Sequence, residues 1–476
     1  MSTHTAAEDQ VPAHEEHMLT PVPEQDRRST LGLAAVWVGF GFVVTGLIVG
    51  GQLAGQGGAP GMAFGPAMLT ITIGELVLFA LTILIGIPAM RTGYNLALLA
   101  KCSYGTMGFI LPMAVMALLT LGWFASILGM IGDIWGALFG NPTGVVLIDP
   151  AALGKVGVAP VTLEVALTCL VFGAVFTWTA YRGISAIEKV ATPVAPFVLV
   201  VALGVSIAML AEFGGIGPMV EEASTRSGMS IGTGLTIVIG AWIAGAIMGA
   251  DIMRFTRSVK AVVICAAACF ILTNPLLNVV GYVGSITTGD SNFVNWMYEK
   301  GLLLAIVGVL VWTTSLWTTN NSELYSNSLY AGPALDAAGA KVRRTTLVLI
   351  AGIVGTVLGS LGFYQLFFAD FITILGAAFV PLAAPIIVDF FIIHRGRYGA
   401  DAYRRQPSVK WPGVLSFLIG ATGGLVFQYV LPLPGGFSAA IAGLLLAVVA
   451  HLLLVAILPK QTVPAHEAAE REETTL

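Results

Sequence analysis

The stretch WVGFGFVVTGLIVGG at 37–51 is uncharged and belongs to a segment long enough to cross a membrane, yet five of its residues are glycine. Glycine weakens a helix and lets the backbone adopt other conformations. The stretch GTGLTIVIGAWIAGAIMGAD at 232–251 has the same character, again with five glycines. We therefore expect both segments to be interrupted membrane helices, because unwound backbone is tolerated at this depth where it lines a cavity. The alternative is that the glycines only allow close helix packing.

The composition indicates a polytopic membrane protein. Of 476 residues, 57% are hydrophobic and 10% charged, with a mean hydropathy of +0.89, whereas soluble domains carry about 25% charged residues. The net charge of −4 argues against a nucleic-acid-binding protein, which would carry a basic surface. The four cysteines have no CxxC spacing, and we place the six histidines outside mid-membrane. These patterns predict neither a disulfide framework nor an enzyme built on clustered His or Cys.

Twelve segments are apolar enough to span the bilayer, at about 20 residues per span. They are 31–53, 66–88, 106–139, 162–180, 191–212, 231–253, 261–286, 302–328, 345–364, 369–394, 412–431 and 438–458. With both ends on one side, 19 of the 22 Lys and Arg fall on that side. Because Lys and Arg concentrate in cytoplasmic loops, we expect a multi-pass plasma-membrane protein with both termini in the cytoplasm.

The two glycine-rich spans are the first and the sixth, five spans apart. A five-span unit crosses an odd number of times, so a second copy must be inverted in the membrane. Paired interrupted helices in two such halves are typical of secondary transporters. The expected fold is therefore an all-α integral membrane protein with twelve transmembrane helices, arranged as a leucine-transporter-like 5+5 inverted repeat plus two C-terminal helices.

The expected divisions of the chain follow from these spans. The two polar ends are predicted to be mobile and cytosolic. The divisions are an N-terminal tail at 1–29, inverted repeats at 30–225 and 226–396, spans 11 and 12 at 397–459, and a C-terminal tail at 460–476.

The eighth span is polar where it should be apolar. The run SLWTTNNSELYSN at 315–327 follows the uncharged LLLAIVGVLVW at 302–312. Ser315, Thr318 and Thr319 share one helical face, so their oxygens could ligate a hard cation such as Na⁺ together with carbonyls of a broken first span. The alternative is that each hydroxyl simply bonds to its own helix. Asn320 offers both a donor and an acceptor, which suits a planar heterocycle with amide-like edges.

Two tryptophans and two acidic residues also lie in apolar spans. Trp123 and Trp242 are at mid-span, although Trp usually lies at the membrane interface; they could stack on a flat ring or fill the core. Glu75 is deep in the second span without a nearby basic residue in sequence. Asp251 ends the sixth span beside Arg254 and Arg257, which favours a structural ion pair at the cytosolic edge over a proton carrier.

Four stretches, in order along spans one, three, six and eight, carry a resemblance to a known family. They are VGFGF at 38–42, LGWF at 121–124, GAWIAGAIMGADIMRF at 240–255 and LWTTNNSELYS at 316–326. Together they resemble the nucleobase–cation–symport family, which includes cytosine permeases and hydantoin transporters.

The resemblance implies roles for particular residues. The implied sodium ligands are backbone carbonyls and hydroxyls of Gly39, Phe42, Ser315, Thr318 and Thr319. The implied base site consists of Trp123, Trp242, Asn320 and the backbone around Ala241. The chain departs from cytosine permeases, which have Phe at the place of Trp242 and Ser at the place of Ala241. It also has Ile127 where hydantoin transporters carry an amide, so the identity of the base stays open.

These observations predict a secondary active transporter that couples Na⁺ entry to uptake of a nucleobase, cytosine or a related purine or pyrimidine, by alternating access. Its expected partners are the base, Na⁺ and lipid, with no nucleic acid and no cofactor, and it is expected to work as a monomer. The alternative is proton-coupled symport of a related heterocycle such as allantoin, a hydantoin or hydroxymethylpyrimidine, with Glu75 or Asp251 as the proton carrier. A channel is disfavoured by the broken spans.

Overall fold

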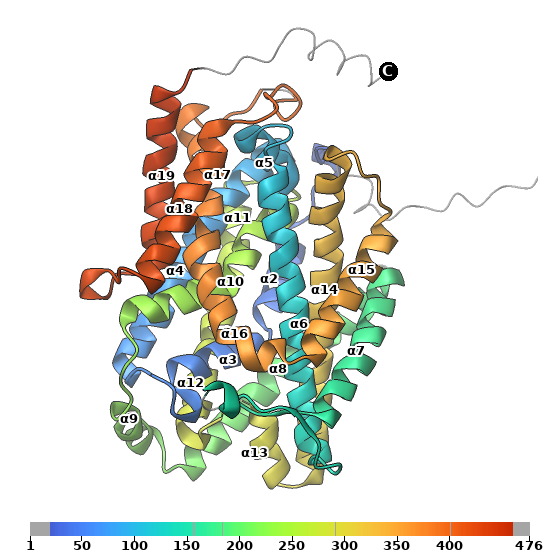
Figure 1. Ribbon diagram of the computed structural model, residues 1–476, viewed down its shortest axis with the longest axis vertical. Helices are drawn as coiled ribbons and strands as arrows, with labels where there is room; N and C mark the ends of the chain where they lie inside the picture. Colours follow the sequence, from blue (N-terminus) through green and yellow to red (C-terminus); the bar gives the residue numbers. More distant parts are fainter. Residues whose placement is uncertain (1–19, 156–157, 183, 291, 400, 460–476) are drawn as a thin grey trace, which may run out of the picture.

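The computed structural model describes residues 20–155, 158–182, 184–290, 292–399 and 401–459 and is a bundle of long helices (Figure 1). Within these residues, nine helices are long and apolar enough to cross a membrane, and two bent helix pairs raise the number to eleven. One further apolar helix, α15, is shorter. The all-helical membrane architecture is thus confirmed, while the count of twelve crossings and the inverted repeat stay predictions.

The helices occupy the predicted spans closely. Their bounds are α2 Thr30–Gly41, α3 Thr45–Leu53, α4 Phe64–Thr92, α5 Leu96–Tyr104, α6 Ile110–Phe139, α7 Leu163–Arg182, α8 Ile184–Glu212, α9 Ile216–Ser224, α10 Ile231–Met253, α11 Val259–Ala267, α12 Asn274–Thr288, α13 Phe293–Glu299, α14 Leu302–Ala337, α15 Arg344–Ser360, α16 Phe363–Ile374, α17 Ala383–Val388, α18 Trp411–Tyr429 and α19 Ala439–Ile457. Three π-helical turns, η4 Ala268–Thr273, η5 Leu375–Phe379 and η7 Asp389–Ile393, interrupt the seventh and tenth spans. A small antiparallel pair, β1 Val146–Ile148 and β2 Val161–Thr162, lies between α6 and α7.

The first span is broken, as its glycines predict. Helix α2 ends at Gly41 and α3 begins at Thr45, and the two helices differ in direction by 50°. Phe42 lies in the break with φ −88° and ψ 61°, outside the helical region. After the fifth span, 191–212, the chain turns by 81° between Phe197–Glu212 and α9, a bend that the sequence did not indicate.

The sixth span is not interrupted, so this prediction is wrong. Helix α10 runs without a break from Ile231 to Met253. Its glycines serve close packing instead: a Cβ on Gly240 would lie 2.0 Å from the carbonyl oxygen of Ile372, and one on Gly249 would lie 3.2 Å from the Trp37 ring. The glycines therefore accompany a break of the backbone in the first span and allow close helix packing in the sixth.

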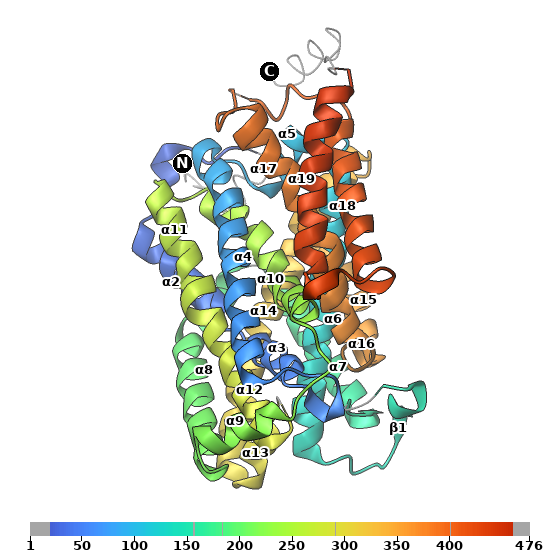
Figure 2. The ribbon, with the colours of Figure 1, turned by 90° about the vertical axis from the view of Figure 1, so that its left-hand side faces the viewer.

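Helix contacts divide the bundle into two groups. In the first group α4 packs along α10, α3 along α12, and α2 against α11 and η4. In the second group α6 packs along α14, and α7 along α15. Helix α8 contacts both α12 and α14, while α18 and α19 form a pair against the tenth span at one side of the molecule (Figure 2).

The described ends of the chain lie toward the same end of the molecule (Figure 2), as an even number of crossings requires. The predicted tails at 1–29 and 460–476 fall outside the described residues except for 20–29. That short segment is packed rather than mobile, since Val22 N donates to Gly93 O (2.9 Å) and Arg28 N donates to Phe255 O (2.9 Å).

Two glycine substitutions test whether a glycine is needed because a neighbouring helix packs closely against it. A Cβ on Gly39 would meet nothing within 4 Å, whereas one on Gly240 would overlap the backbone of α16. We expect Gly39→Ala to give as much monodisperse protein as the wild type in size-exclusion chromatography. Gly240→Ala should lose most of its folded protein, because overpacking against backbone costs about 1–3 kcal/mol or more. Equal yields of both variants would contradict this packing account of α10.

Candidate substrate and ion site

The break in the first span frees backbone carbonyls. Phe42 N donates to Val38 O (3.1 Å), and the next bond in the series runs from Gly46 N to Val43 O (3.0 Å). Within the described residues, the carbonyls between these two bonds, those of 39–42, therefore lack the helical partners that a continuous helix would give them. The two predicted carbonyl ligands of this span, Gly39 and Phe42, are among these four.

On α14, the predicted hydroxyl ligands converge on one carbonyl. Thr318 Oγ1 donates to Ser315 O (2.8 Å), and Thr319 Oγ1 donates to the same oxygen (3.1 Å). Ser315 is buried, and both threonines are half-buried. Such bonds to the preceding turn are common in membrane helices, but each hydroxyl oxygen keeps lone pairs that can bind a cation. Helices α2 and α14 both pack against α8.

The two neighbouring asparagines of α14 differ completely. Asn321 is anchored to α7: in the amide orientation that satisfies all its neighbours, Nδ2 donates to Phe176 O (2.9 Å) and Oδ1 accepts from Trp317 Nε1 (3.0 Å). Asn320 is fully buried, yet within the described residues neither its Nδ2 nor its Oδ1 has a hydrogen-bond partner. A buried amide left unpaired costs about 1–3 kcal/mol of stability. Asn320 is therefore the residue of this helix that we expect to form hydrogen bonds with a ligand.

Hydrogen bonds between α6 and α14 fix which parts of the two helices lie side by side. Trp135 Nε1 donates to Thr313 Oγ1 (3.0 Å) near one end, and Asn327 Nδ2 donates to Ala117 O (2.6 Å) near the other. The helices run antiparallel, and Asn320 is midway between residues 313 and 327 of α14. It therefore lies opposite Ser126, which is midway between residues 117 and 135 of α6 and about one turn from Trp123.

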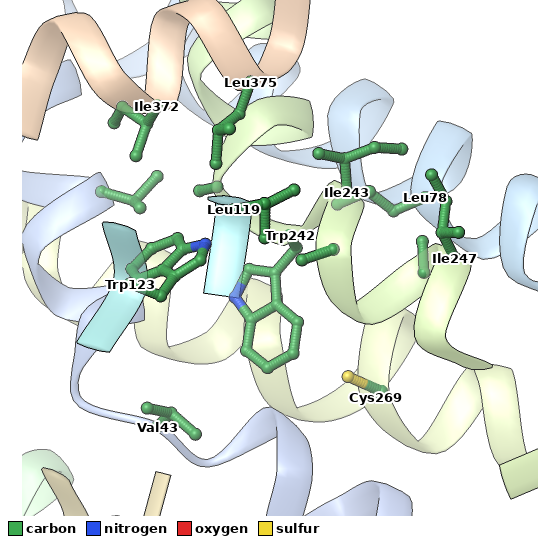
Figure 3. Close-up of a cluster of buried hydrophobic side chains, with 14 of the residues drawn as sticks. Val43, Leu78, Leu119, Trp123, Trp242, Ile243, Ile247, Cys269, Ile372 and Leu375 are labelled. Carbon is green, nitrogen blue, oxygen red and sulfur yellow. The ribbon is translucent and has the colours of Figure 1, made fainter. Parts of the chain in front are cut away.

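Trp123 and Trp242 belong to one buried cluster, with Val43 of the broken span beside them (Figure 3). They are 5% and 8% exposed. Trp242 meets the ring of Phe40 edge-on, with the centroids 5.4 Å apart, so it lies next to the break. Trp123 meets Phe368 and Phe371 of α16 edge-on, at 5.8 Å each. The two indoles thus come from different helix groups and belong to one buried cluster, in which Trp242 lies next to the unwound segment.

The remaining predicted position, Ala241, is buried at 6% exposure next to Trp242. Ile127, one turn beyond Trp123, is fully buried and offers no hydrogen bond. An amide does approach α6 from α16: Gln365 Nε2 donates to Asp133 Oδ1 (2.6 Å), while its buried Oε1 has no partner in the described residues. Gln365 was not among the predicted site residues, although a polar side chain in the apolar stretch FYQLFFADF is recognisable in the sequence.

Two acidic residues near helix ends, Asp251 and Asp389, have partners in the structure. Asp251 accepts from Leu96 N (2.9 Å) and from Tyr330 OH (2.8 Å), so it joins α10 to α5 and α14. Of the two neighbouring arginines, Arg257 donates to Arg27 O (2.8 Å), and Arg254 Nε donates to the backbone oxygen of Asp251 (3.2 Å). Asp389, at the end of the tenth span, pairs with Lys410 at 2.8 Å. Its hydrogen bond with His394 raises the pKa of that imidazole above the usual value.

One histidine, His451, is buried between α18 and α19. His451 lies inside α19, is 1% exposed, and its Nδ1 is 3.0 Å from Ser416 Oγ on α18. The expectation that none of the six histidines lies in mid-membrane stays a prediction. The partner of His451 is a serine, and no group of three His, Cys, Asp or Glu that could hold a metal occurs in the described parts of the chain.

The long apolar helices, the broken first span and a buried amide without a hydrogen-bond partner among the described residues are features of a polytopic membrane transporter. The family of permeases for cytosine and purines, uracil, thiamine and allantoin matches residues 21–446. The chain belongs to this family, nucleobase–cation–symport-1.

Curated relatives agree. The chain is 29% identical to the cytosine permease of Escherichia coli K12 over 427 residues, 90% of this chain and 93% of that one. It is 23% identical to the hydantoin permease of Microbacterium maritypicum over 469 residues, 93% and 89% of the two chains. A purine-uracil permease of Arabidopsis thaliana is 24% identical, covering 87% and 70%.

Solved structures share the fold. The inward-facing conformation of Mhp1 has a TM-score of 0.73 at 20% identity, covering 95% of this chain and 96% of that one. Mhp1 in a closed conformation with bromovinylhydantoin bound has a TM-score of 0.70 at 20% identity, covering 96% and 100%. A Na⁺-coupled sialic acid symporter is more distant, with a TM-score of 0.52 at 13% identity, covering 90% and 99%.

Proposed function

We propose that this permease is a Na⁺-coupled symporter that brings a nucleobase, or a closely related planar heterocycle, into the cell by alternating access. It would work as a monomer in the plasma membrane with both termini in the cytoplasm. The single observation that carries the proposal is Asn320, a fully buried amide with no hydrogen-bond partner among the described residues. A heterocycle with adjacent N–H and C=O groups would satisfy both amide atoms at once.

The sodium part of the proposal rests on donor chemistry. Free carbonyls at Gly39 and Phe42 would complete a set of neutral oxygen ligands with Ser315 O and the hydroxyls of Thr318 and Thr319. An alkali ion takes such oxygen ligands. Coupling requires that the ion and the base favour the same conformation. The break provides the link, because the unwound residues would touch the ion while Phe40, just before them, touches Trp242.

The base would lie between Trp123 and Trp242, with Asn320 and the backbone near Ala241 bonding to its edge. The relatives are a cytosine permease, a hydantoin permease and a purine-uracil permease, which supports the class of planar heterocycles rather than one member of it.

The alternative is proton-coupled symport. Asp251 is a poor carrier, since both its carboxylate oxygens already accept hydrogen bonds. Glu75 is the remaining candidate, because it is 2% exposed and one of its oxygens is unpartnered among the described residues.

Uptake into proteoliposomes separates the two coupling modes. The purified protein is first screened by thermal shift against cytosine, uracil, adenine, hypoxanthine, allantoin and hydantoins, with Na⁺ or with K⁺. The best ligand is then offered under a Na⁺ gradient at equal pH, and under a pH gradient without Na⁺. The proposal predicts concentrative uptake only in the first condition. Uptake driven by the pH gradient alone would overturn it in favour of proton coupling.

A further inference from the structure

A second buried polar cluster lies between α4 and α12. Glu75 Oε1 accepts from Asn274 Nδ2 (2.6 Å) and from Asn278 Nδ2 (2.7 Å). The two asparagines are one helical turn apart, and the three residues are 2%, 0% and 1% exposed. Two short amide bonds to a single oxygen are typical of an ionised carboxylate.

Each member of this cluster has an oxygen left over. Within the described residues, Glu75 Oε2, Asn274 Oδ1 and Asn278 Oδ1 are buried and have no hydrogen-bond partner. All three atoms can only accept when the carboxylate is ionised. Buried polar atoms are nearly always satisfied, so a group of unsatisfied ones needs an explanation such as a bound ion or water.

The cluster borders the broken span. A Cβ on Gly46 of α3 would lie 3.3 Å from Asn274 Oδ1 and 3.4 Å from Asn278 Oδ1, so both oxygens face the same point of α3. Helices α3 and α12 are in direct backbone contact, since a Cβ on Gly50 would lie 2.0 Å from Asn278 O. The π-helical turn η4 ends immediately before Asn274, and such turns often mark functional sites.

The charge of the cluster needs a counter-ion. In the part of the chain that the structure describes, the groups that act on Glu75 are the two asparagine amides and burial, with no Lys or Arg paired to it. An isolated buried carboxylate costs several kcal/mol. A proton on Oε2 could satisfy that oxygen and only one amide oxygen, whereas a Na⁺ bound to all three oxygens would satisfy each of them and neutralise the charge.

We propose that Glu75, Asn274 and Asn278 form a second Na⁺ site, separate from the one proposed between the first and eighth spans. The ion would bind three side-chain oxygens and hold α4 and α12 together beside α3. This site goes beyond the proposed function and needs no base, so it can be tested without transport.

The test is equilibrium binding of ²²Na⁺ to the purified full chain without base. The wild type should bind two Na⁺, and Glu75→Gln should bind one, because glutamine keeps the volume and its amide can donate to a vacant asparagine oxygen. Thr318→Ala/Thr319→Ala should also bind one, and the combined variant none. Thr82→Val is the matched control: Thr82 lies seven residues further along α4, is buried, and its hydroxyl has no partner in the described residues, so its loss should leave Na⁺ binding unchanged.

The outcomes are distinguishable. Wild-type Na⁺ binding by folded Glu75→Gln overturns the second site. So does a Glu75→Gln variant that keeps both Na⁺ ions but loses the pH dependence of base binding, because the cluster would then hold a proton. If Glu75→Gln does not fold, Asn278→Ala replaces it, with Na⁺ affinity at the second site expected to fall at least tenfold. Loss of one ion in Glu75→Gln with no loss in Thr318→Ala/Thr319→Ala would uphold this site and refute the ion site of the proposed function.

Discussion

Thr318→Ala/Thr319→Ala should abolish Na⁺-driven uptake while leaving a folded protein. Each hydroxyl ligand of a buried ion is worth about 1–3 kcal/mol, so removing two should weaken Na⁺ affinity by at least about thirtyfold. The fold should persist, because both hydroxyls bond only to Ser315 of their own helix. The measurement is initial uptake of the best ligand as a function of external Na⁺.

Thr314→Ala is the control for this experiment. Thr314 lies on the same helix, and its hydroxyl likewise bonds to the preceding turn, at Leu310 O. It is not part of the proposed ion site, so its Na⁺ dependence should match the wild type. Unchanged Na⁺-driven uptake in the double variant would refute the assignment of both threonines.

Asn320→Ala should eliminate base binding without destabilising the protein, and Asn321→Ala should do the reverse. Removing the Asn320 amide takes away both polar contacts to the base, which predicts an affinity loss of about a hundredfold or more. It breaks no hydrogen bond among the described residues, so the unliganded melting temperature should not fall. Asn321 joins α14 to Thr179 and Phe176 of α7, and its loss should cost about 1–3 kcal/mol of stability.

Both effects are read from one thermal-shift titration of each variant with the base. The two residues are chemically identical neighbours on the same helix, so each serves as the control for the other. A drop in melting temperature for Asn320→Ala without ligand would show that its amide has a structural partner, and the base assignment would then fail.

Much of the fold follows from composition and periodicity. Spans of about 20 apolar residues set the helix positions, and the glycines at 39, 41, 46 and 50 indicated the break in α2–α3. The same reasoning failed for α10, because glycine permits both an unwound backbone and a tight helix crossing, and the sequence does not say which neighbour approaches. Gly240 is explained by the backbone of Ile372 and Gly376, residues more than 130 positions away in sequence.

The candidate site shows the same division. The polar face of α14 was visible from spacing, but the difference between Asn320 and Asn321 depends on which of them faces α7, and this is set by tertiary packing. Glu75 looked unpaired in the sequence, whereas its partners Asn274 and Asn278 come from a helix about 200 residues later. The π-helical turn before them is equally invisible in sequence, because it reflects local packing rather than residue preference.

An experimental structure of the protein with its best ligand and Na⁺ bound would test the proposed base and ion sites most directly. We expect a flat density between Trp123 and Trp242 within hydrogen-bonding distance of Asn320, and an ion in direct contact with the hydroxyls of Thr318 and Thr319. A ligand bound away from Asn320, or threonine hydroxyls that contact only their own helix while Na⁺ is present elsewhere, would contradict this expectation.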